Sequence, residues 1–330
     1  MKHANLSIFV PHNGCPNRCV FCNQVNISGQ AFEPTGDDVR RLCEAHLAEN
    51  AGKECEIAFF GGSFTAVRRE YMLELLDAAS PFVKSGAAAG IRISTRPDAI
   101  TPEILDILKE RGVTAIELGA QSMDDRVLDL NRRGHRADDV RAASAMIKRY
   151  GFSLGLQMMV GMYGESDARA AAEYTANELA ALLPDTVRIY PTLVVSDTEL
   201  FELYSKGVYT PLPLDEAVDI TAALLAKFAD RQITVIRAGL HADESLRGSV
   251  EAGPFHPAFR ELCESRIMRG VFERLLTDKP QGDYAVAVAE RGESRAIGDK
   301  RSNIQFFLQK GYRIKIIGQS GLSRYEAKLI

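Results

Sequence analysis

Long apolar runs and any strong excess of charge are missing from this 330-residue sequence. No run approaches the roughly twenty residues that cross a bilayer, and the first five residues lack the apolar region of a secretory signal. The net charge of -4 gives no overall attraction for nucleic acid, so such binding would need a local basic patch. Internal repeats and low-complexity tracts do not occur either. We therefore expect a soluble, cytoplasmic enzyme with no membrane partner.

Cysteine is scarce, and its spacing is informative. Six cysteines without a signal peptide indicate a reducing compartment and argue against a disulfide framework. Three of them, Cys15, Cys19 and Cys22, form a C-x3-C-x2-C run soon after the apolar stretch Leu6 to Val10. Three thiolates can hold three irons of a 4Fe-4S cluster, and no fourth cysteine lies close by. The pattern predicts a cluster whose fourth iron is open to a substrate or cofactor.

Zinc is the competing ligand for these thiolates. A structural zinc site needs four ligands, commonly in two pairs. His12 is a candidate fourth ligand, but no second pair follows the triad. Cys43, Cys55 and Cys263 are isolated within regular or apolar patterns, so we expect them to be small buried hydrophobic residues.

Short apolar strands alternate with amphipathic helices along the first 190 residues, which favours parallel pairing and right-handed crossovers. The six expected strands are Leu6 to Val10, Ile57 to Phe60, Ile91 to Ser94, Ala115 to Leu118, Leu154 to Val160 and Val187 to Tyr190. The expected helices are Asp37 to Glu49, Glu70 to Val83, Pro102 to Arg111, Asp138 to Tyr150 and Asp167 to Leu182. A full barrel, a partial barrel and an open doubly wound sheet all fit this α/β pattern.

Residues suited to chemistry follow the expected strands. The cysteines come after the first strand, Gly61-Gly62-Ser63 after the second and Gln121 after the fourth, and Ser94 lies on the third. Parallel α/β folds build their sites at these carboxyl ends.

The region beyond Tyr190 is less regular. It is expected to contain helices at Thr198 to Ser205, Asp215 to Ala229, Ala258 to Leu276 and Ile304 to Lys310, and strands at Thr234 to Arg237, Tyr284 to Ala289 and Tyr312 to Ile317. We predict a core domain over residues 1–240 and, over 241–330, a small C-terminal α/β appendage of unknown role that packs against it.

The segment Gly61-Gly62-Ser63-Phe64-Thr65 is a weak signal by itself. A tight turn from strand to helix explains it equally well, and its spacing matches neither standard phosphate-binding glycine loop. Two glycines do let a ligand approach the backbone. Beside an open iron, a backbone carbonyl and the Ser63 hydroxyl could receive an ammonium group held on the metal.

Together these segments resemble the radical SAM superfamily, and within it the branch of the Elongator catalytic subunit. The resemblance runs from about Ser7 to about Gly239. Besides the cysteine and glycine motifs, it is carried by Ser94-Thr95-Arg96-Pro97-Asp98, Glu117-Leu118-Gly119-Ala120-Gln121-Ser122, Asn131-Arg132-Arg133-Gly134-His135 and Ile189-Tyr190-Pro191-Thr192-Leu193.

The resemblance implies a partial (β/α)6 barrel of the TIM type and two cofactors, a 4Fe-4S cluster on Cys15, Cys19 and Cys22 and S-adenosylmethionine on its open iron. An electron from an external donor of the flavodoxin or ferredoxin type would split the cofactor into methionine and a 5'-deoxyadenosyl radical, which abstracts hydrogen from a substrate.

The resemblance also implies that Gly61, Gly62 and Ser63 face the methionine amino group, while Ser94, Gln121, Arg133 and Gln157 hold its carboxylate, ribose and adenine edge. Each role has a structural alternative. Arg133 could belong to a solvated basic helix face. The two glutamines could be satisfied by neighbouring backbone. Tyr190 is expected either in the core or facing the substrate.

Departures from the Elongator pattern limit what it implies. About ninety residues follow Gly239, too few for the acetyltransferase domain of that family, and no glycine-rich pyrophosphate loop occurs in them. A tRNA substrate remains open through a modest basic cluster of Arg132, Arg133, Arg136, Arg141, Lys148 and Arg149.

We therefore expect a radical SAM oxidoreductase or transferase acting on an unidentified substrate, with tRNA as a candidate. The alternative is a non-catalytic iron-sulfur RNA-binding protein that retains the scaffold. Coproporphyrinogen-type decarboxylation fits less well, because Cys22-Asn23-Gln24 lacks the further cysteine that follows the triad in those enzymes.

Overall fold

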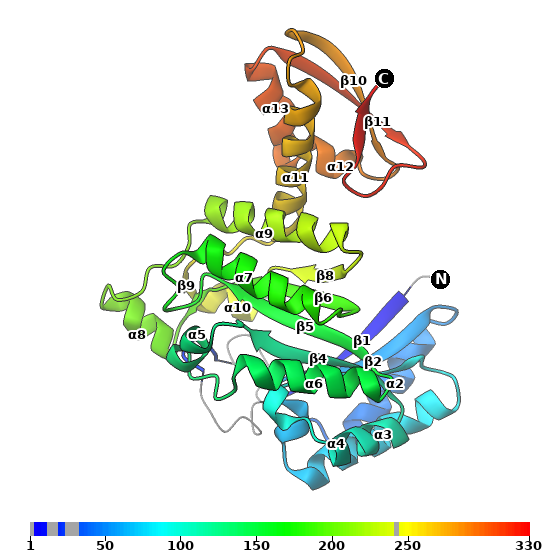
Figure 1. The fold of residues 1–330 in the computed structure, drawn as a ribbon. Coiled ribbons are helices and arrows are strands. Elements are labelled where there is room, and N and C mark those ends of the chain that lie inside the picture. The colour runs from blue at the N-terminus through cyan, green and yellow to red at the C-terminus, as the bar shows by residue number, and fades with distance from the viewer. Residues whose placement is uncertain (1–2, 12–18, 24–32, 241–243) are drawn as a thin grey trace.

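The computed structural model describes residues 3–11, 19–23, 33–240 and 244–330. Its main body is a curled half-barrel of seven parallel strands in the order β1-β2-β3-β4-β5-β6-β8 (Figure 1). The strands are β1 (His3–Val10), β2 (Glu54–Gly61), β3 (Gly90–Thr95), β4 (Val113–Gln121), β5 (Ser153–Val160), β6 (Thr186–Pro191) and β8 (Thr234–Ala238). The expected partial barrel is confirmed, and the strand expected at Thr234 to Arg237 adds a seventh member beside β6.

Helices connect successive strands and cover the outer face of the half-barrel (Figure 1). They are α2 (Gly36–Glu49), α3 (Arg69–Lys84), α4 (Pro102–Glu110), α6 (Ala137–Arg149), α7 (Ala168–Ala181) and α9 (Leu214–Asp230). The short helix α5 (Asp125–Leu130) follows β4 and lies at the end of the strands. Helix α4 begins as a capped proline start should, because the Thr101 hydroxyl accepts a hydrogen bond from the Ile104 amide at 3.2 Å and Pro102 has no amide to satisfy.

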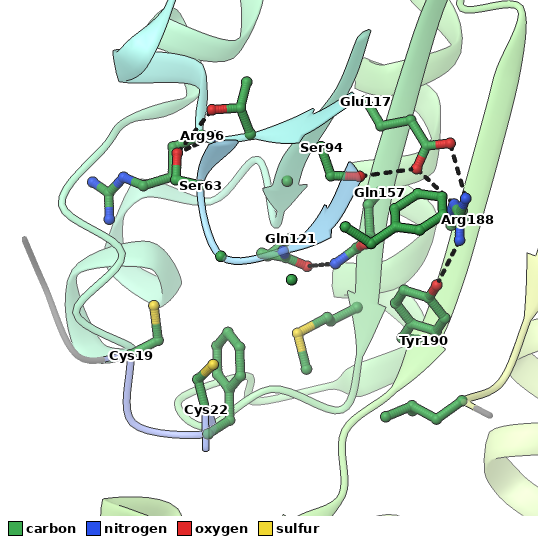
Figure 2. Close-up of a pocket in the computed structure, with 18 of the residues that line it drawn as sticks. Cys19, Cys22, Ser63, Ser94, Arg96, Glu117, Gln121, Gln157, Arg188 and Tyr190 are labelled. Atoms are coloured by element: carbon green, nitrogen blue, oxygen red, sulfur yellow. Dashed lines mark hydrogen bonds and ion pairs between the residues drawn. The ribbon is translucent and has the colours of Figure 1, made fainter. Parts of the chain in front are cut away.

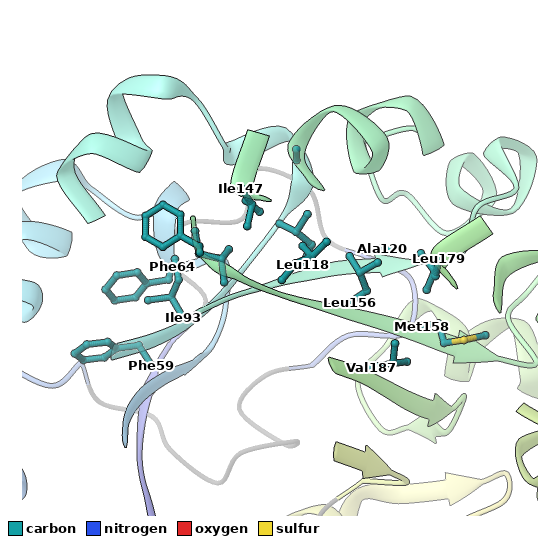
Figure 3. Packing of buried hydrophobic residues seen from close by; sticks show 14 of the residues in the cluster. Phe59, Phe64, Ile93, Leu118, Ala120, Ile147, Leu156, Met158, Leu179 and Val187 are labelled. Carbon is teal, nitrogen blue, oxygen red and sulfur yellow. The ribbon is translucent and has the colours of Figure 1, made fainter. Parts of the chain in front are cut away.

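The main core lies between the strands and these helices. Ile93, Leu118 and Leu156 are essentially inaccessible to solvent, as are Phe59 and Phe64, whose rings stack with centroids 4.8 Å apart (Figure 3). Each such side chain contributes roughly 1.5–3 kcal/mol through its transfer from water. This packing fixes the strand ends that carry the polar residues.

Smaller elements follow β6 and border the open end of the half-barrel. They are the two-stranded antiparallel sheet of β7 (Val194–Val195) and β9 (Val250–Ala252), with helices α8 (Glu199–Ser205) and α10 (Glu244–Ser249). Of these, the sequence predicted only α8.

The last seventy residues form a separate small α/β unit on helix α11 (Phe259–Leu276) (Figure 1). Strands β10 (Gly282–Ala289) and β11 (Tyr312–Gln319) are parallel and are separated by α12 (Glu293–Ile297) and α13 (Ser302–Gln309), as expected for a βαβ appendage. The short antiparallel strand β12 (Ala327–Leu329) was not expected.

Helix α11 belongs to two hydrophobic cores. Phe259 and Cys263, near its start, pack in the main core. Met268 and Phe272, further along, pack in the core of the small unit. The division of the chain at residue 240 stays a prediction. Among the described helices, none is both long enough and apolar enough to cross a membrane.

Candidate functional site

A cavity of about 480 Å³ opens at the carboxyl ends of the barrel strands (Figure 2). Every described residue that the sequence predicted as a site residue lines it. These residues are Cys19, Cys22, Gly61, Gly62, Ser63, Ser94, Gln121, Arg133 and Gln157. Cys15 lies outside the described residues, so its predicted role is carried here by the sequence alone.

Two of the three motif cysteines reach this cavity from the segment after β1. Figure 2 shows the Cys19 and Cys22 side chains on the same side of the pocket. The Cys22 amide donates to the Cys19 carbonyl at 3.1 Å, which closes a tight turn. Neighbouring Val20 donates to the Asn131 carbonyl at 3.3 Å and accepts from the Leu200 amide at 2.7 Å. The residue that follows α5 and the helix α8 thus hold this turn in place.

The remaining cysteines behave as expected. Cys43, Cys55 and Cys263 are buried free thiols. Burial raises the pKa of the Cys43 thiol to about 12, so this side chain stays a neutral hydrophobic group near neutral pH. These three cysteines lie in the core and do not line the cavity.

Arg133 is buried in the cavity wall and is therefore not part of a solvated helix face. Its Nη1 lies 3.1 Å from Cys19 Sγ, and its Nη2 donates to the Gly119 carbonyl at 2.7 Å. Its Nε is buried without a hydrogen-bond partner among the described residues. A buried guanidinium with an unused donor is suited to an anionic group.

Three other arginines of the basic cluster have acidic neighbours. Arg132 pairs with Glu199 at 2.8 Å, Arg136 pairs with two aspartates of α5, and Arg141 pairs with Asp138 and Glu178. These exposed pairs offset the positive charge that the sequence suggested for RNA binding.

Gln121 and Gln157 satisfy each other in part, because Gln157 Nε2 donates to Gln121 Oε1 at 3.1 Å. Gln121 ends β4 with φ of 66°, a left-handed conformation that is uncommon for a residue other than glycine. The register between β4 and β5 shifts at this point. Such backbone strain gathers at functional sites, and here it turns the amide into the cavity (Figure 2).

The glycine motif forms the sharp end of β2. Gly61 has φ of 117°, and a Cβ on it would lie 2.3 Å from the Val10 carbonyl oxygen, so β1 leaves no room for a side chain. The Ser63 hydroxyl lies 2.8 Å from Thr95 Oγ1 and accepts from the Arg96 amide at 3.1 Å. The Ser63 side chain is therefore engaged with the end of β3.

A charged network in the cavity wall was missed by sequence reasoning. Glu117 on β4 is buried and accepts hydrogen bonds from Arg188 Nη2 at 2.9 Å and from Arg92 Nη1 at 3.3 Å. Its carboxylate also forms an ion pair with Arg188 Nε at 2.7 Å. Predicted Ser94 also contacts it, at 3.4 Å (Figure 2). The signal was present in the sequence, since Glu117 and Arg188 each interrupt an otherwise apolar strand.

Arg188 extends this network towards Tyr190. Its Nη1 donates to the Tyr190 hydroxyl at 3.3 Å, and its guanidinium lies 4.8 Å from the centre of the Phe60 ring. Burial is the largest single effect and works against the charge, but Glu117 and Tyr190 together outweigh burial and raise the pKa of Arg188. Tyr190 is half-buried and lines the cavity, which is the substrate-facing alternative of the two expected for it.

Family comparison matches residues 9–174 to the radical SAM superfamily and residues 184–269 to the Radical_SAM C-terminal domain. The chain belongs to the radical SAM superfamily. Members of this superfamily use a 4Fe-4S cluster and S-adenosylmethionine, and these are its cofactors.

Two curated relatives share about a third of the aligned residues. One is the tRNA uridine(34) acetyltransferase of Methanocaldococcus infernus, 34% identical over 57% of this chain and 39% of its own length. The other is Elongator complex protein 3 of Saccharomyces cerevisiae, 32% identical over 52% of this chain and 34% of its own length. The chain thus spans less than half of each relative.

Solved structures confirm the fold. The archaeal Methanocaldococcus infernus Elp3 with an N-terminal deletion superposes with a TM-score of 0.62 over 82% of this chain and 64% of that one, at 21% identity. The resemblance to the Elongator catalytic subunit is therefore confirmed by the relatives, and the expected fold by this structure.

The cavity fits the two cofactors. Two cysteine thiols supply soft ligands of the type that iron-sulfur clusters need, and the unused Nε of Arg133 lies in the same wall. The 480 Å³ volume falls in the usual range for small-molecule sites.

Proposed function

We propose that this chain holds a 4Fe-4S cluster on Cys15, Cys19 and Cys22, cleaves S-adenosylmethionine reductively at it, and directs the radical chemistry at a nucleotide of tRNA. One observation carries the proposal: a single cavity brings together Cys19, Cys22 and the predicted cofactor residues of β2, β3, β4 and β5. When bound, the two cofactors supply a 5'-deoxyadenosyl radical.

The chain's own residues bind and orient the cofactor in this proposal. Arg133 holds the methionine carboxylate with its guanidinium fork, and the backbone of Gly61 and Gly62 receives the methionine amino group. Ser94, Gln121 and Gln157 lie across the cavity at the ribose and adenine side. The Ser63 hydroxyl, already engaged with Thr95, supports the glycine turn beside them.

The Arg188 and Tyr190 side of the cavity is assigned to the substrate. The apolar walls around Phe60 and Met159 help to exclude water from the reacting atoms. The tRNA assignment is supported by the similarity to tRNA uridine(34) acetyltransferases. We assign the reaction to the cytoplasm, where thiols stay reduced, and the electron to a donor of the flavodoxin or ferredoxin type.

The test is anaerobic. Protein reconstituted with iron and sulfide is given dithionite and S-adenosylmethionine, and 5'-deoxyadenosine is measured by liquid chromatography. Cys19→Ala should reduce its formation to background, because the cluster loses a ligand, while the matched control Cys43→Ala, in the core of the barrel, should retain it. Product formation by Cys19→Ala at the wild-type rate would refute the mechanism.

The substrate assignment has its own test. Nucleosides of tRNA from a deletion strain and its parent are compared by mass spectrometry, and loss of one modified nucleoside is expected. RNA binding that is tight and salt-sensitive but indifferent to S-adenosylmethionine, without any nucleoside product, would instead support a non-catalytic RNA-binding protein.

A further inference from the structure

A second cavity of about 200 Å³ lies where β8 ends and α11 begins. Arg237 and Leu240 line both this cavity and the main one, so the two are neighbours with a common wall. Arg237 and Arg260 give the smaller cavity two guanidinium groups, and Glu261 gives it one carboxylate.

Arg237 is a half-buried cation without a matching anion. Its Nε donates to the Gly239 carbonyl at 3.3 Å, and it makes no ion pair within the described ranges of the chain. Burial lowers the pKa of Arg237, Tyr190 opposes the shift, and the nearby cations Arg188 and Arg260 add to it. A cation in such surroundings is stabilised by an anionic ligand.

Arg260 adds to the positive charge at this place. Its Nη1 donates to the Val235 carbonyl at 2.9 Å and its Nε to Glu264 at 3.0 Å. The same buried Glu264 carboxylate also pairs with Arg324 at 2.5 Å and Arg295 at 3.6 Å. One carboxylate therefore serves three guanidinium groups.

We propose that this second cavity binds a phosphate group of the substrate while the reacting part of the substrate occupies the main cavity. The proposal rests on the proposed function, because a tRNA nucleotide carries a phosphate beside its base and sugar. Arginine binds phosphate through two parallel hydrogen bonds, which suits a site with two guanidinium groups. Glu261, which is exposed, also lines this cavity and opposes an anion there, so the proposal assigns the phosphate to the two guanidinium groups.

The probes are inorganic phosphate, uridine 5'-monophosphate and, as the phosphate-free control, uridine, each titrated calorimetrically into the full chain. The nucleotide should bind at least about tenfold more tightly than the nucleoside, as a charge-assisted hydrogen bond provides. Arg237→Gln should abolish this ratio and weaken binding of inorganic phosphate. Arg237→Lys should restore part of both, because it keeps the charge but not the fork.

The matched control is Arg231→Gln, which removes an exposed arginine at the end of α9 and should keep the ratio. Three results would each overturn the phosphate site. The wild type could bind nucleotide and nucleoside equally tightly, it could fail to bind inorganic phosphate, or Arg237→Gln could keep the wild-type ratio of nucleotide to nucleoside affinity. Formation of 5'-deoxyadenosine, measured separately on reconstituted protein, reports on the proposed function alone, because the phosphate titrations need neither cofactor.

Discussion

The carboxylate of Glu117 stands at the centre of the charges in the cavity wall. It is 4% exposed and lies between Arg92 of β3 and Arg188 of β6. A buried charge pair adds little over a well-packed apolar pair, but removing one partner leaves the other charge uncompensated. Glu117 is thus the carboxylate partner of Arg188 in the cavity wall, while Arg92 has a second carboxylate partner in Glu56 at 2.7 Å.

Glu117→Gln should therefore lower the free energy of unfolding by about 3 kcal/mol or more, measured by urea unfolding. The exposed control Glu110→Gln, next to Arg111 on the outer surface, should change it little. Equal stability of Glu117→Gln and wild type would show that the two guanidinium groups do not depend on this carboxylate.

The sequence pointed to residues that line the cavity but not to the charged network, for a physical reason. The cysteine triad and Gly61-Gly62-Ser63 are local patterns whose spacing is meaningful by itself. Glu117 and Arg188 lie 71 residues apart and are joined only when β5 places β4 near β6. A buried charge is visible in the sequence, but its partner is not.

At the scale of elements, the loop after β5 contains a carboxyl group, that of Glu165, whose pKa is raised. Glu165 accepts from the Gly161 amide at 3.1 Å, yet burial outweighs these backbone hydrogen bonds and raises its pKa to about 8. The folded state then holds a proton that the unfolded chain has released, over the range from about pH 4.5 to pH 8.

Stability should consequently fall as the pH rises through this range, since the native state binds more protons there. Glu165→Gln removes this titrating group, so the midpoint temperature of thermal unfolding should change less with pH between about pH 5 and pH 8. The exposed control Glu173→Gln on α7 should keep the wild-type slope. A wild-type slope in Glu165→Gln would place the titrating group elsewhere.

Element prediction succeeded where the hydrophobic period was long enough to recognise. The sequence predicted the barrel strands and the helices α2, α3, α4, α6 and α7. Each of these elements is long enough for its pattern of apolar residues to repeat at least once. Strand β7 has two residues and β9 three, and helix α5 has six. Such short segments depend on tertiary neighbours, which no local pattern records.

At the scale of the whole molecule, two hydrophobic cores share one helix. Phe272 of α11 is inaccessible to solvent and lies against Phe307 of α13, with ring centroids 5.9 Å apart. The strands β10 and β11 complete this second core. The small unit can therefore lose its own packing while the barrel core, which holds Phe259 and Cys263, remains intact.

Phe272→Ala should destabilise the small unit by about 3–5 kcal/mol. Native-state hydrogen exchange should then speed up at β10 and β11 and stay unchanged at β4 and β5. Phe228→Ala, in the barrel core on α9, is the reciprocal control. Faster exchange throughout the chain in Phe272→Ala would mean that the two cores unfold as one.

Helix α11 is 18 residues long, which corresponds to about 27 Å at the usual rise per residue. Because each end of this helix packs in a different core, its length sets the distance between the mouth of the barrel and the small sheet. A macromolecule that contacts both the mouth of the barrel and the small sheet must therefore have two contact points separated by about the length of α11. The length of this helix thus restricts which partners can contact both surfaces at once.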